Sequence, residues 1–322
     1  MPDKISYFYR QKQMAKFRMN HSRESGMSSG TVVRVGLFTA LIGALLYVFR
    51  MFSNDPEGIQ ENPTRQEMPK TPEKPADTKA IYWPASSTGA LIQKQYYYLS
   101  YSEQHEQAEW VAYILTKEEL DQPWVERPEE FTPDPDIPTG SALPNDYSGS
   151  GYDRGHLVPN ADRSFSDAAA RETFQMSNIS PQARQFNQGI WRELEELTRN
   201  WAKKYKRLYI VTGPVLTQAP KGKIGRQNKV SIPAAYFKVI LDLDDPEQKA
   251  IGFVLPNEVS YDPLYKYAVS VDEVEKITGI DFFEAFLPDE LEEKLESSFN
   301  NDLWQYSKDK FEERINKWNN VR

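Results

Sequence analysis

Hydrophobic and polar positions divide the chain into regions of different character. Residues 1–34 are polar and basic, and an uncharged apolar run then extends from Val35 to Phe49. Residues 53–80 are rich in Pro, Glu, Lys and Thr and contain almost no apolar side chains. From about Ile81 onward, apolar residues recur at the spacings of strands and helices. The pattern predicts one folded domain over 81–322, preceded by a tail, an apolar segment and a spacer.

Within the folded region, stretches rich in aromatic and β-branched residues predict strands. These stretches are 96–102, 110–116, 207–216, 230–241 and 250–257, with a shorter one at 157–159. Ser166 is suited to cap a short helix over 167–176, and apolar positions at helical spacing predict a longer helix over 188–205. The tail from about Pro288 has an acidic, amphipathic, helical pattern. Because most strands are joined by loops rather than by regular crossover helices, the predicted fold class is α+β.

The apolar run is close to the length that spans a bilayer. Extended from Thr31 to Phe52, it approaches the ~20 residues needed, provided that Arg34 and Arg50 reach the lipid surface. Basic residues precede it and acidic residues follow, which places the N-terminus in the cytoplasm by the positive-inside rule. A cleaved signal peptide and a buried core helix are the alternatives. No small-residue cleavage site follows the run, and a core helix would have nothing to pack against beside the spacer.

We therefore expect four segments. They are a basic cytoplasmic tail over 1–34, an uncleaved single-pass transmembrane anchor over 35–52, a disordered Pro-rich linker over 53–80 and the folded domain over 81–322. The anchor predicts that the folded domain lies outside the cytoplasm, in a periplasmic or extracellular space.

Composition limits the chemistry that the chain can perform. It contains no cysteine, which excludes disulfides, thiolate metal sites and a cysteine nucleophile. Residues 1–80 hold 12 Lys and Arg against 8 Asp and Glu, so the rest of the chain holds 27 against 39, a net charge of −12. An acidic domain binds nucleic acid poorly by bulk charge. Any phosphate substrate would therefore depend on local positive charge or on a metal ion.

One of the three histidines lies in an unusual setting. His156 belongs to the stretch GYDRGHLVPNADR, where Arg154 and glycine precede it and a proline follows closely. A neutral imidazole is well matched to proton abstraction near neutral pH. A histidine that is merely solvated or hydrogen-bonded in a loop is the alternative.

A second motif, SNISPQARQFNQGIWRELEEL, follows about 20 residues later. It contains Asn178, Asn187 and Glu195, with Asn187 directly before the predicted long helix. An ordinary helix cap and a solvated helical glutamate are the simpler explanations for Asn187 and Glu195. Amide and carboxylate oxygens are nevertheless the hard ligands that Mg²⁺ prefers. A histidine base, an amide ligand for one hydrated Mg²⁺ and nearby arginines are sufficient for phosphodiester hydrolysis.

These motifs, in this order, resemble the DNA/RNA non-specific endonuclease family, the ββα-metal nucleases. The resemblance runs from about Tyr96 to Pro256 and includes WVAYILT, RPEEFTPDP, DRGH, NISPQARQFNQGIWRELE and YIVTGPV. It implies a ββα-metal fold with a central, mostly antiparallel sheet flanked by helices. It also implies cleavage of DNA and RNA with little choice of sugar or sequence, and products with 5′-phosphate ends.

The resemblance also implies roles for individual residues. His156 is the general base that activates water, and Asn187 binds the single Mg²⁺, for which Mn²⁺ substitutes. Glu195 holds one of the ion's water ligands and Asn178 orients the site near the ion. Arg154 contacts phosphate and Arg127 stabilises charge in the transition state. Relatives are often dimers, which makes a homodimer an expectation by analogy alone.

Two other functions stay open. The fold could serve as a catalytically silent scaffold anchored at the cell envelope, but such a copy would be expected to have lost His156, Asn187 or Arg154, and all three are present. The same residues would also serve a hydrolase of small phosphodiesters.

Overall fold

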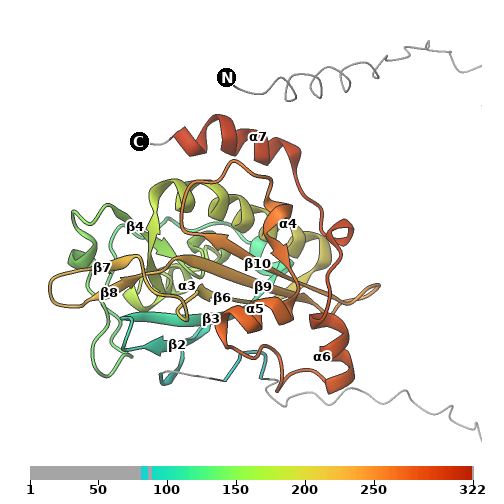
Figure 1. Ribbon diagram of the computed structural model, residues 1–322, viewed down its shortest axis with the longest axis horizontal. Helices are drawn as coiled ribbons and strands as arrows, with labels where there is room; N and C mark the ends of the chain where they lie inside the picture. Colours follow the sequence, from blue (N-terminus) through green and yellow to red (C-terminus); the bar gives the residue numbers. More distant parts are fainter. Residues whose placement is uncertain (1–80, 86–88, 321–322) are drawn as a thin grey trace, which may run out of the picture. The chain divides into compact units, whose positions relative to one another are not determined.

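A seven-stranded sheet runs through the middle of the protein in the computed structural model, which describes residues 81–85 and 89–320 (Figure 1). Its strand order is β1-β2-β3-β6-β9-β10-β11, and every neighbouring pair is antiparallel. Two two-stranded sheets, β4-β5 and β7-β8, accompany it. The strands are β1 (Leu91–Gln93), β2 (Tyr98–Ser102), β3 (Gln107–Thr116), β4 (Tyr152–His156), β5 (Ile179–Ala183), β6 (Arg207–Pro214), β7 (Gly222–Ile224), β8 (Val230–Ile232), β9 (Ala235–Asp242), β10 (Lys249–Pro256) and β11 (Ala268–Val269).

Helices cover both faces of the large sheet. In Figure 1, α4 lies on one side and α5 and α6 lie on the other. The α-helices are α2 (Lys117–Leu120), α3 (Asp167–Glu172), α4 (Arg192–Tyr205), α5 (Val271–Thr278), α6 (Asp289–Glu296) and α7 (Lys308–Asn316). Single turns of 3₁₀-helix are η1 (Pro144–Tyr147), η2 (Asn160–Asp162), η3 (Met176–Asn178), η5 (Leu264–Tyr267), η6 (Asn301–Leu303) and η7 (Trp318–Asn320), and η4 (Phe186–Trp191) is π-helical.

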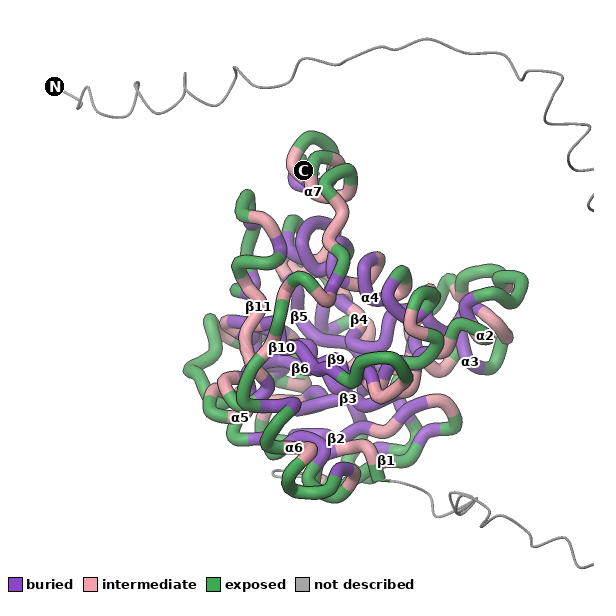
Figure 2. Tube along the Cα trace, turned by 90° about the vertical axis from the view of Figure 1, so that its right-hand side faces the viewer, coloured by how far each residue is buried: buried purple, intermediate pink, exposed green. Residues whose placement is uncertain are grey.

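Alternating side chains of the central strands build two separate cores. Strand β9 sends Tyr236 and Ile240 into the core beneath α4, and Phe237 and Val239 into the core beneath α5 and α6. The period of two in an extended strand produces this division. Figure 2 shows that the buried stretches concentrate along β3, β6, β9 and β10. Both faces being covered explains why these strands read as nearly continuous apolar runs.

The predicted α+β class and the central antiparallel sheet are confirmed, with local corrections. The stretch predicted as one strand over 230–241 is two strands, β8 and β9, because residues around Pro233 interrupt the pairing. The short helix capped by Ser166 ends at Glu172 rather than at 176. Residues 157–159, predicted as a strand, are not one, because β4 comes earlier and ends at His156.

The predicted long helix over 188–205 is also corrected. Its first part belongs to η4, where Gly189 has the non-helical angles φ −106° and ψ −108°, and α4 begins only at Arg192. Asn187 is therefore not the cap of that helix, whose N-terminal boundary residue is Trp191.

The membrane anchor falls outside the described part of the chain. The predicted tail (1–34), anchor (35–52) and linker (53–80) all lie among residues that the structure does not describe. Across the residues that it does describe, no helix combines the length and apolar character needed to cross a bilayer.

Candidate active site

The small sheet β4-β5 carries the DRGH motif. His156, the last residue of β4, pairs with Ile179, and Gly155 pairs with Ser180. A Cβ atom on Gly155 would lie 2.2 Å from the side chain of Gln182. Glycine precedes His156 because β4 packs closely against Gln182, and not because the chain needs flexibility there.

Two phenylalanines fix the imidazole of His156. Its ring centroid lies 5.5 Å from that of Phe131 and 4.9 Å from that of Phe174. Each phenylalanine ring also has a guanidinium over it, Arg154 at 5.4 Å on Phe131 and Arg127 at 4.9 Å on Phe174. Cation–π contacts of this kind hold arginines while leaving N–H donors available. The arrangement brings three predicted site residues, His156, Arg154 and Arg127, around one aromatic pair.

The Nε2 atom of His156 is buried and has no hydrogen-bond partner among the described residues. Burial, and to a smaller extent the positive charge of Arg127, lowers the pKa of His156 to about 3. The imidazole is therefore neutral near neutral pH. A buried polar atom without a partner is uncommon in folded proteins and is typical of a functional site. The geometry favours a proton acceptor over the alternative of a loop histidine whose hydrogen bonds are satisfied.

Asn187 is attached to the same strand through Asp153. The Asn187 Nδ2 atom donates to Asp153 Oδ2 over 3.1 Å, so the side-chain oxygen of Asn187 is the atom left to accept a ligand. In the same segment, Trp191 Nε1 donates to the backbone oxygen of His156 over 3.4 Å. The π-helical segment η4 and strand β4 are thus joined at two points, which sets Asn187 in position relative to His156.

Glu195 lies in a group of buried and half-buried charges on the α4 face of the sheet. We call Asp162, Glu195, Arg199 and Lys238 the mixed-charge cluster. Burial raises the pKa of Glu195 to about 7, against the opposing effects of Arg199 and Lys238. Arg199 donates to Asp162 over 2.9 Å. The carboxylates and cations of the cluster offset one another, which keeps Glu195 near the point where it gains or loses a proton.

Lys238 is the unexpected member of this cluster. It is fully buried, its Nζ lies 5.0 Å from the ring centroid of Trp191, and it has no hydrogen-bond partner among the described residues. Burial lowers the pKa of Lys238 to about 8, while Glu195 and Asp162 oppose that change. Its signal in the sequence is a single charge inside the apolar strand AAYFKVIL, facing the same way as Tyr236 and Ile240.

Asn178 is placed differently from the other predicted site residues. Its Oδ1 accepts from the backbone N–H of Val158 over 2.9 Å, and its Nδ2 donates to the backbone oxygens of Val158 and Thr173. The side chain is fully buried. Asn178 therefore positions the chain directly after His156, and its amide is occupied by backbone partners.

The arginines differ in how much of their charge faces the site. Arg154 donates to the backbone oxygen of Pro144 over 2.8 Å. Arg127 is exposed, and its charge acts on both His156 and Glu195. Arg163, which ends the stretch GYDRGHLVPNADR, is buried and donates to the backbone oxygens of Ile114 and Tyr96. Its guanidinium is therefore occupied by backbone partners.

Two hollows lie near the arginines. One of about 680 Å³ is lined by Arg127, Arg171 and Phe174, but also by five acidic residues, Glu126, Glu129, Glu130, Asp167 and Glu172. Another of about 650 Å³ is lined by Lys223, Arg226 and Asp146 and by both neighbours of Pro144, whose backbone oxygen accepts from Arg154. The first hollow is therefore predominantly acidic, and the second has only one more basic than acidic residue in its lining.

The side chains of Asn187 and Glu195 have the donor chemistry that suits a hard divalent cation. The Asn187 amide oxygen and the Glu195 carboxylate are oxygen donors, and the chain contains no cysteine to favour a softer ion. Asp153 is a residue that the sequence motifs contained but to which no role was given. It orients the Asn187 amide by accepting its N–H group, as residues surrounding a metal site commonly do.

Comparisons with known proteins point to one family. A model of the family described as DNA/RNA non-specific endonuclease matches residues 74–289. A nuclease of Nostoc sp. is 35% identical over 66% of this chain and 79% of its own length, and the human mitochondrial nuclease EXOG is 35% identical over 58% of this chain and 54% of its own. A crystal structure titled as the EndoG/EndoGI complex has a chain that superposes with a TM-score of 0.58 at 29% identity, over 63% of this chain and 89% of that one.

Proposed function

This chain belongs to the DNA/RNA non-specific endonuclease family, and from that premise we propose how its site hydrolyses phosphodiester bonds. The observation that carries the proposal is the buried, unpartnered Nε2 of neutral His156, set between two rings that each hold an arginine. The substrates are DNA and RNA without sequence preference. Weak choice of sequence follows if the protein contacts phosphates rather than base edges.

In this proposal His156 accepts at Nε2 the proton of the attacking water. Its low pKa makes the imidazole available as a base, but also makes it a weak one. A phosphate that binds beside Arg127 and Arg154 offsets their positive charge, and this raises the pKa of His156 when substrate is present. The base thereby becomes stronger in the complex that reacts.

Asn187 would hold Mg²⁺ through its side-chain oxygen and Glu195 would hold one of the ion's water ligands, with Mn²⁺ as a substitute ion. Such a cation would supply positive charge that offsets the charge developing on the leaving oxygen. Arg154 binds the phosphate, and Arg127 stabilises the charge that develops on the non-bridging oxygens. Cleavage of the bond between phosphorus and O3′ leaves 5′-phosphate ends.

The test is cleavage of supercoiled plasmid and of single-stranded RNA by the full chain, with MgCl₂ or with EDTA. The proposal predicts metal-dependent cleavage of both and 5′-phosphate ends in the products. Asn187→Ala is expected to lose at least ~100-fold in activity, since even residues around a metal site commonly contribute 10–100-fold. Asn200→Ala, an exposed position on α4, is the matched control and keeps full activity.

If this test fails, its outcome distinguishes the two alternative functions. A folded protein that cleaves neither polymer with Mg²⁺ or Mn²⁺ but hydrolyses a chromogenic phosphodiester is an enzyme for small substrates. A folded protein that cleaves none of the three is a scaffold on a nuclease fold.

We also propose that the enzyme is tethered to a membrane through residues 35–52, with the nuclease domain outside the cytoplasm and the N-terminus inside. The support is the uncharged run Val35–Phe49 between basic and acidic flanks. Protease added to intact cells would digest the domain if this is right, and would leave it untouched if the domain faces the cytoplasm.

A homodimer, proposed by analogy alone, predicts twice the chain mass in light scattering.

A further inference from the structure

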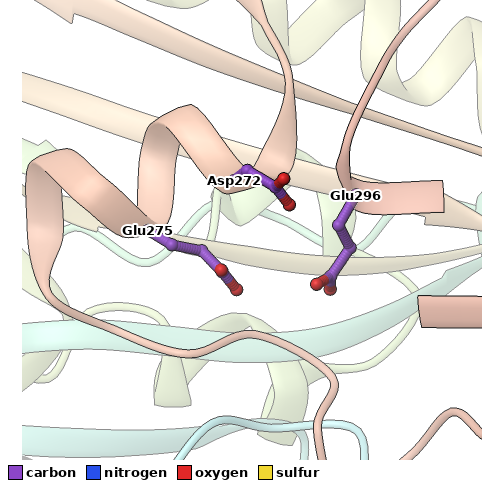
Figure 3. Close-up of side chains that lie close together, drawn as sticks. All are labelled: Asp272, Glu275 and Glu296. Carbon is purple, nitrogen blue, oxygen red and sulfur yellow. The ribbon is translucent and has the colours of Figure 1, made fainter. Parts of the chain in front are cut away.

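A group of acidic side chains lies on the face of the sheet opposite the active site. Asp272 and Glu275 come from α5, and Glu296 comes from the end of α6. One carboxylate oxygen from each lies within 4.8 Å of the other two. Figure 3 shows the three carboxylates turned toward one another from the two helices. We call these three residues the α5–α6 carboxylate group.

Among the described residues, no strong positive charge or hydrogen bond offsets the burial of the Glu296 carboxylate. Glu296 is only 4% exposed, and its Oε1 is buried without a hydrogen-bond partner among the described residues. No cation is among the charges that act most strongly on it, which are Glu275, Glu292, Asp272 and Asp281. Burying a carboxylate among other carboxylates is costly unless a proton or a metal ion compensates the charge.

We infer that the α5–α6 carboxylate group binds a calcium ion, which connects α5 to the C-terminal part of the chain. Glu275 uses its Oε1 to accept the backbone N–H of Phe282 over 2.8 Å, so Oε2 is the oxygen available to the ion. Asp272 is exposed and provides the entry side, while buried Glu296 closes the opposite side. The site thus has an anchored ligand, an open ligand and a buried ligand that lacks any other partner.

Ligand chemistry and spacing favour calcium over other common ions. Three carboxylates and no histidine disfavour zinc, which prefers nitrogen and sulfur ligands. Two oxygens on one ion can lie at most twice the bond length apart, about 4.6–5.2 Å for Ca²⁺ and about 4.0–4.2 Å for Mg²⁺. Three oxygens within 4.8 Å of one another need only a small contraction to reach Ca²⁺, and a larger contraction to reach the smaller Mg²⁺.

The site is separate from the family's catalytic centre. Its residues pack under the sheet face that holds α5 and α6, away from the core beneath α4. The family match ends at residue 289, before Glu296, so the buried ligand comes from outside the matched region. The inference does not depend on the proposed nuclease function.

Calcium binding is tested on the full chain carrying Asn187→Ala, which removes the proposed active-site ligand. After treatment with chelator, calorimetric titration with CaCl₂ is expected to show one bound Ca²⁺ per chain. Millimolar CaCl₂ should raise the melting temperature by about 2–5 °C, because an ion that binds only the folded state stabilises it. MgCl₂ at equal concentration should produce a clearly smaller rise.

Two further substitutions in that background locate the ion. Glu296→Gln should abolish both the binding heat and the shift, whereas Glu293→Gln, at an exposed position of α6, should preserve them. Asp272→Asn, at the exposed edge, serves as a second variant should Glu296→Gln fold poorly. Absence of calcium binding, its persistence in the ligand variants, or an equal response to both ions would overturn the inference.

Discussion

The two faces of the central sheet treat buried charge in opposite ways. On the α4 face, the carboxylates Asp162 and Glu195 lie among the cations Arg199 and Lys238. On the opposite face, the charges that act most strongly on Glu296 are all acidic. Both faces expose little of these side chains to water. The first arrangement is balanced by the protein itself, and the second requires a proton or a metal ion from solution.

The charges on the α4 face are preorganised by the protein, whereas those on the opposite face depend on an external ligand. Internal compensation lets the α4 face keep its charges in place without a bound ion, which suits the role proposed for Glu195. Because a proton or an ion from solution must offset its charge, the α5–α6 carboxylate group should respond to pH and to the proposed calcium ion. Substitutions that change the balance of charge on one face should therefore have different effects on the two faces.

The largest effect is expected from unpairing a buried charge on the α4 face. Arg314 of α7 donates to Glu193 of α4 over 2.5 Å, and both side chains are almost fully buried. Arg314→Met would leave Glu193 buried without its partner, at a cost of about 3–5 kcal/mol. The melting temperature, measured by circular dichroism, should fall by roughly 10 °C.

The control lies on the same helix. Lys310→Met removes a partly exposed pair with Glu196, which is expected to cost about 1 kcal/mol or less. Equal losses of stability in the two variants would show that burial does not distinguish these pairs.

A smaller effect is expected from removing the buried cation of the mixed-charge cluster. Lys238 lowers the pKa of Glu195, so Lys238→Met should raise that pKa further and leave Glu195 more often protonated near neutral pH. Cleavage at pH 7 should fall by about tenfold, equivalent to ~1.4 kcal/mol, and should recover partly at pH 8.5. Lys203→Met, an exposed position of α4, should change neither value. A loss that is the same at both pH values would contradict the proposed link to Glu195.

A gain of stability is expected on the opposite face when calcium is absent. Burial, together with Glu275, Glu292, Asp272 and Asp281, raises the pKa of Glu296 to about 9. The folded chain then binds more protons than the unfolded chain between about pH 5 and pH 9, so its free energy of unfolding falls as pH rises across that range.

Glu296→Gln removes this titration. In EDTA its melting temperature should exceed that of the wild type, by about 2–4 °C for each ~1 kcal/mol gained, and the difference should grow from pH 6 to pH 8.5. Thermal unfolding at the two pH values measures it. A difference that shrinks with rising pH would mean that Glu296 is already ionised and compensated.

Local sequence patterns predicted much of the fold. Strands such as β3 and β10 were recognisable because aromatic and β-branched residues fill both of their faces. The kink at Gly189 was not, since it depends on a distant contact: a Cβ there would lie 2.6 Å from the Asn319 side chain, more than 100 residues away. Local periodicity carries no information about such a contact.

The site shows the same limit. Ordered motifs predicted the roles of His156 and Asn187, and the family resemblance that the motifs carried is confirmed. The aromatic pair that fixes the imidazole joins Phe131 and Phe174, which no short motif connects. Lys238 and Glu296 were missed because their significance lies in their burial, and a charged residue in a sequence is normally expected at the surface.

The most direct test of the central claim, that neutral His156 is the base of a metal-dependent nuclease, compares two histidines. His105 is also half-buried, but its Nδ1 lies 3.0 Å from the hydroxyl of Ser231, on the turn between β2 and β3. Plasmid nicking by the full chain with MgCl₂ should fall by about 10²–10⁴-fold in His156→Ala, at an unchanged binding affinity for DNA. His105→Ala should retain activity within about threefold of the wild type. Retention of nicking by folded His156→Ala, or equal losses in the two variants, would contradict the account.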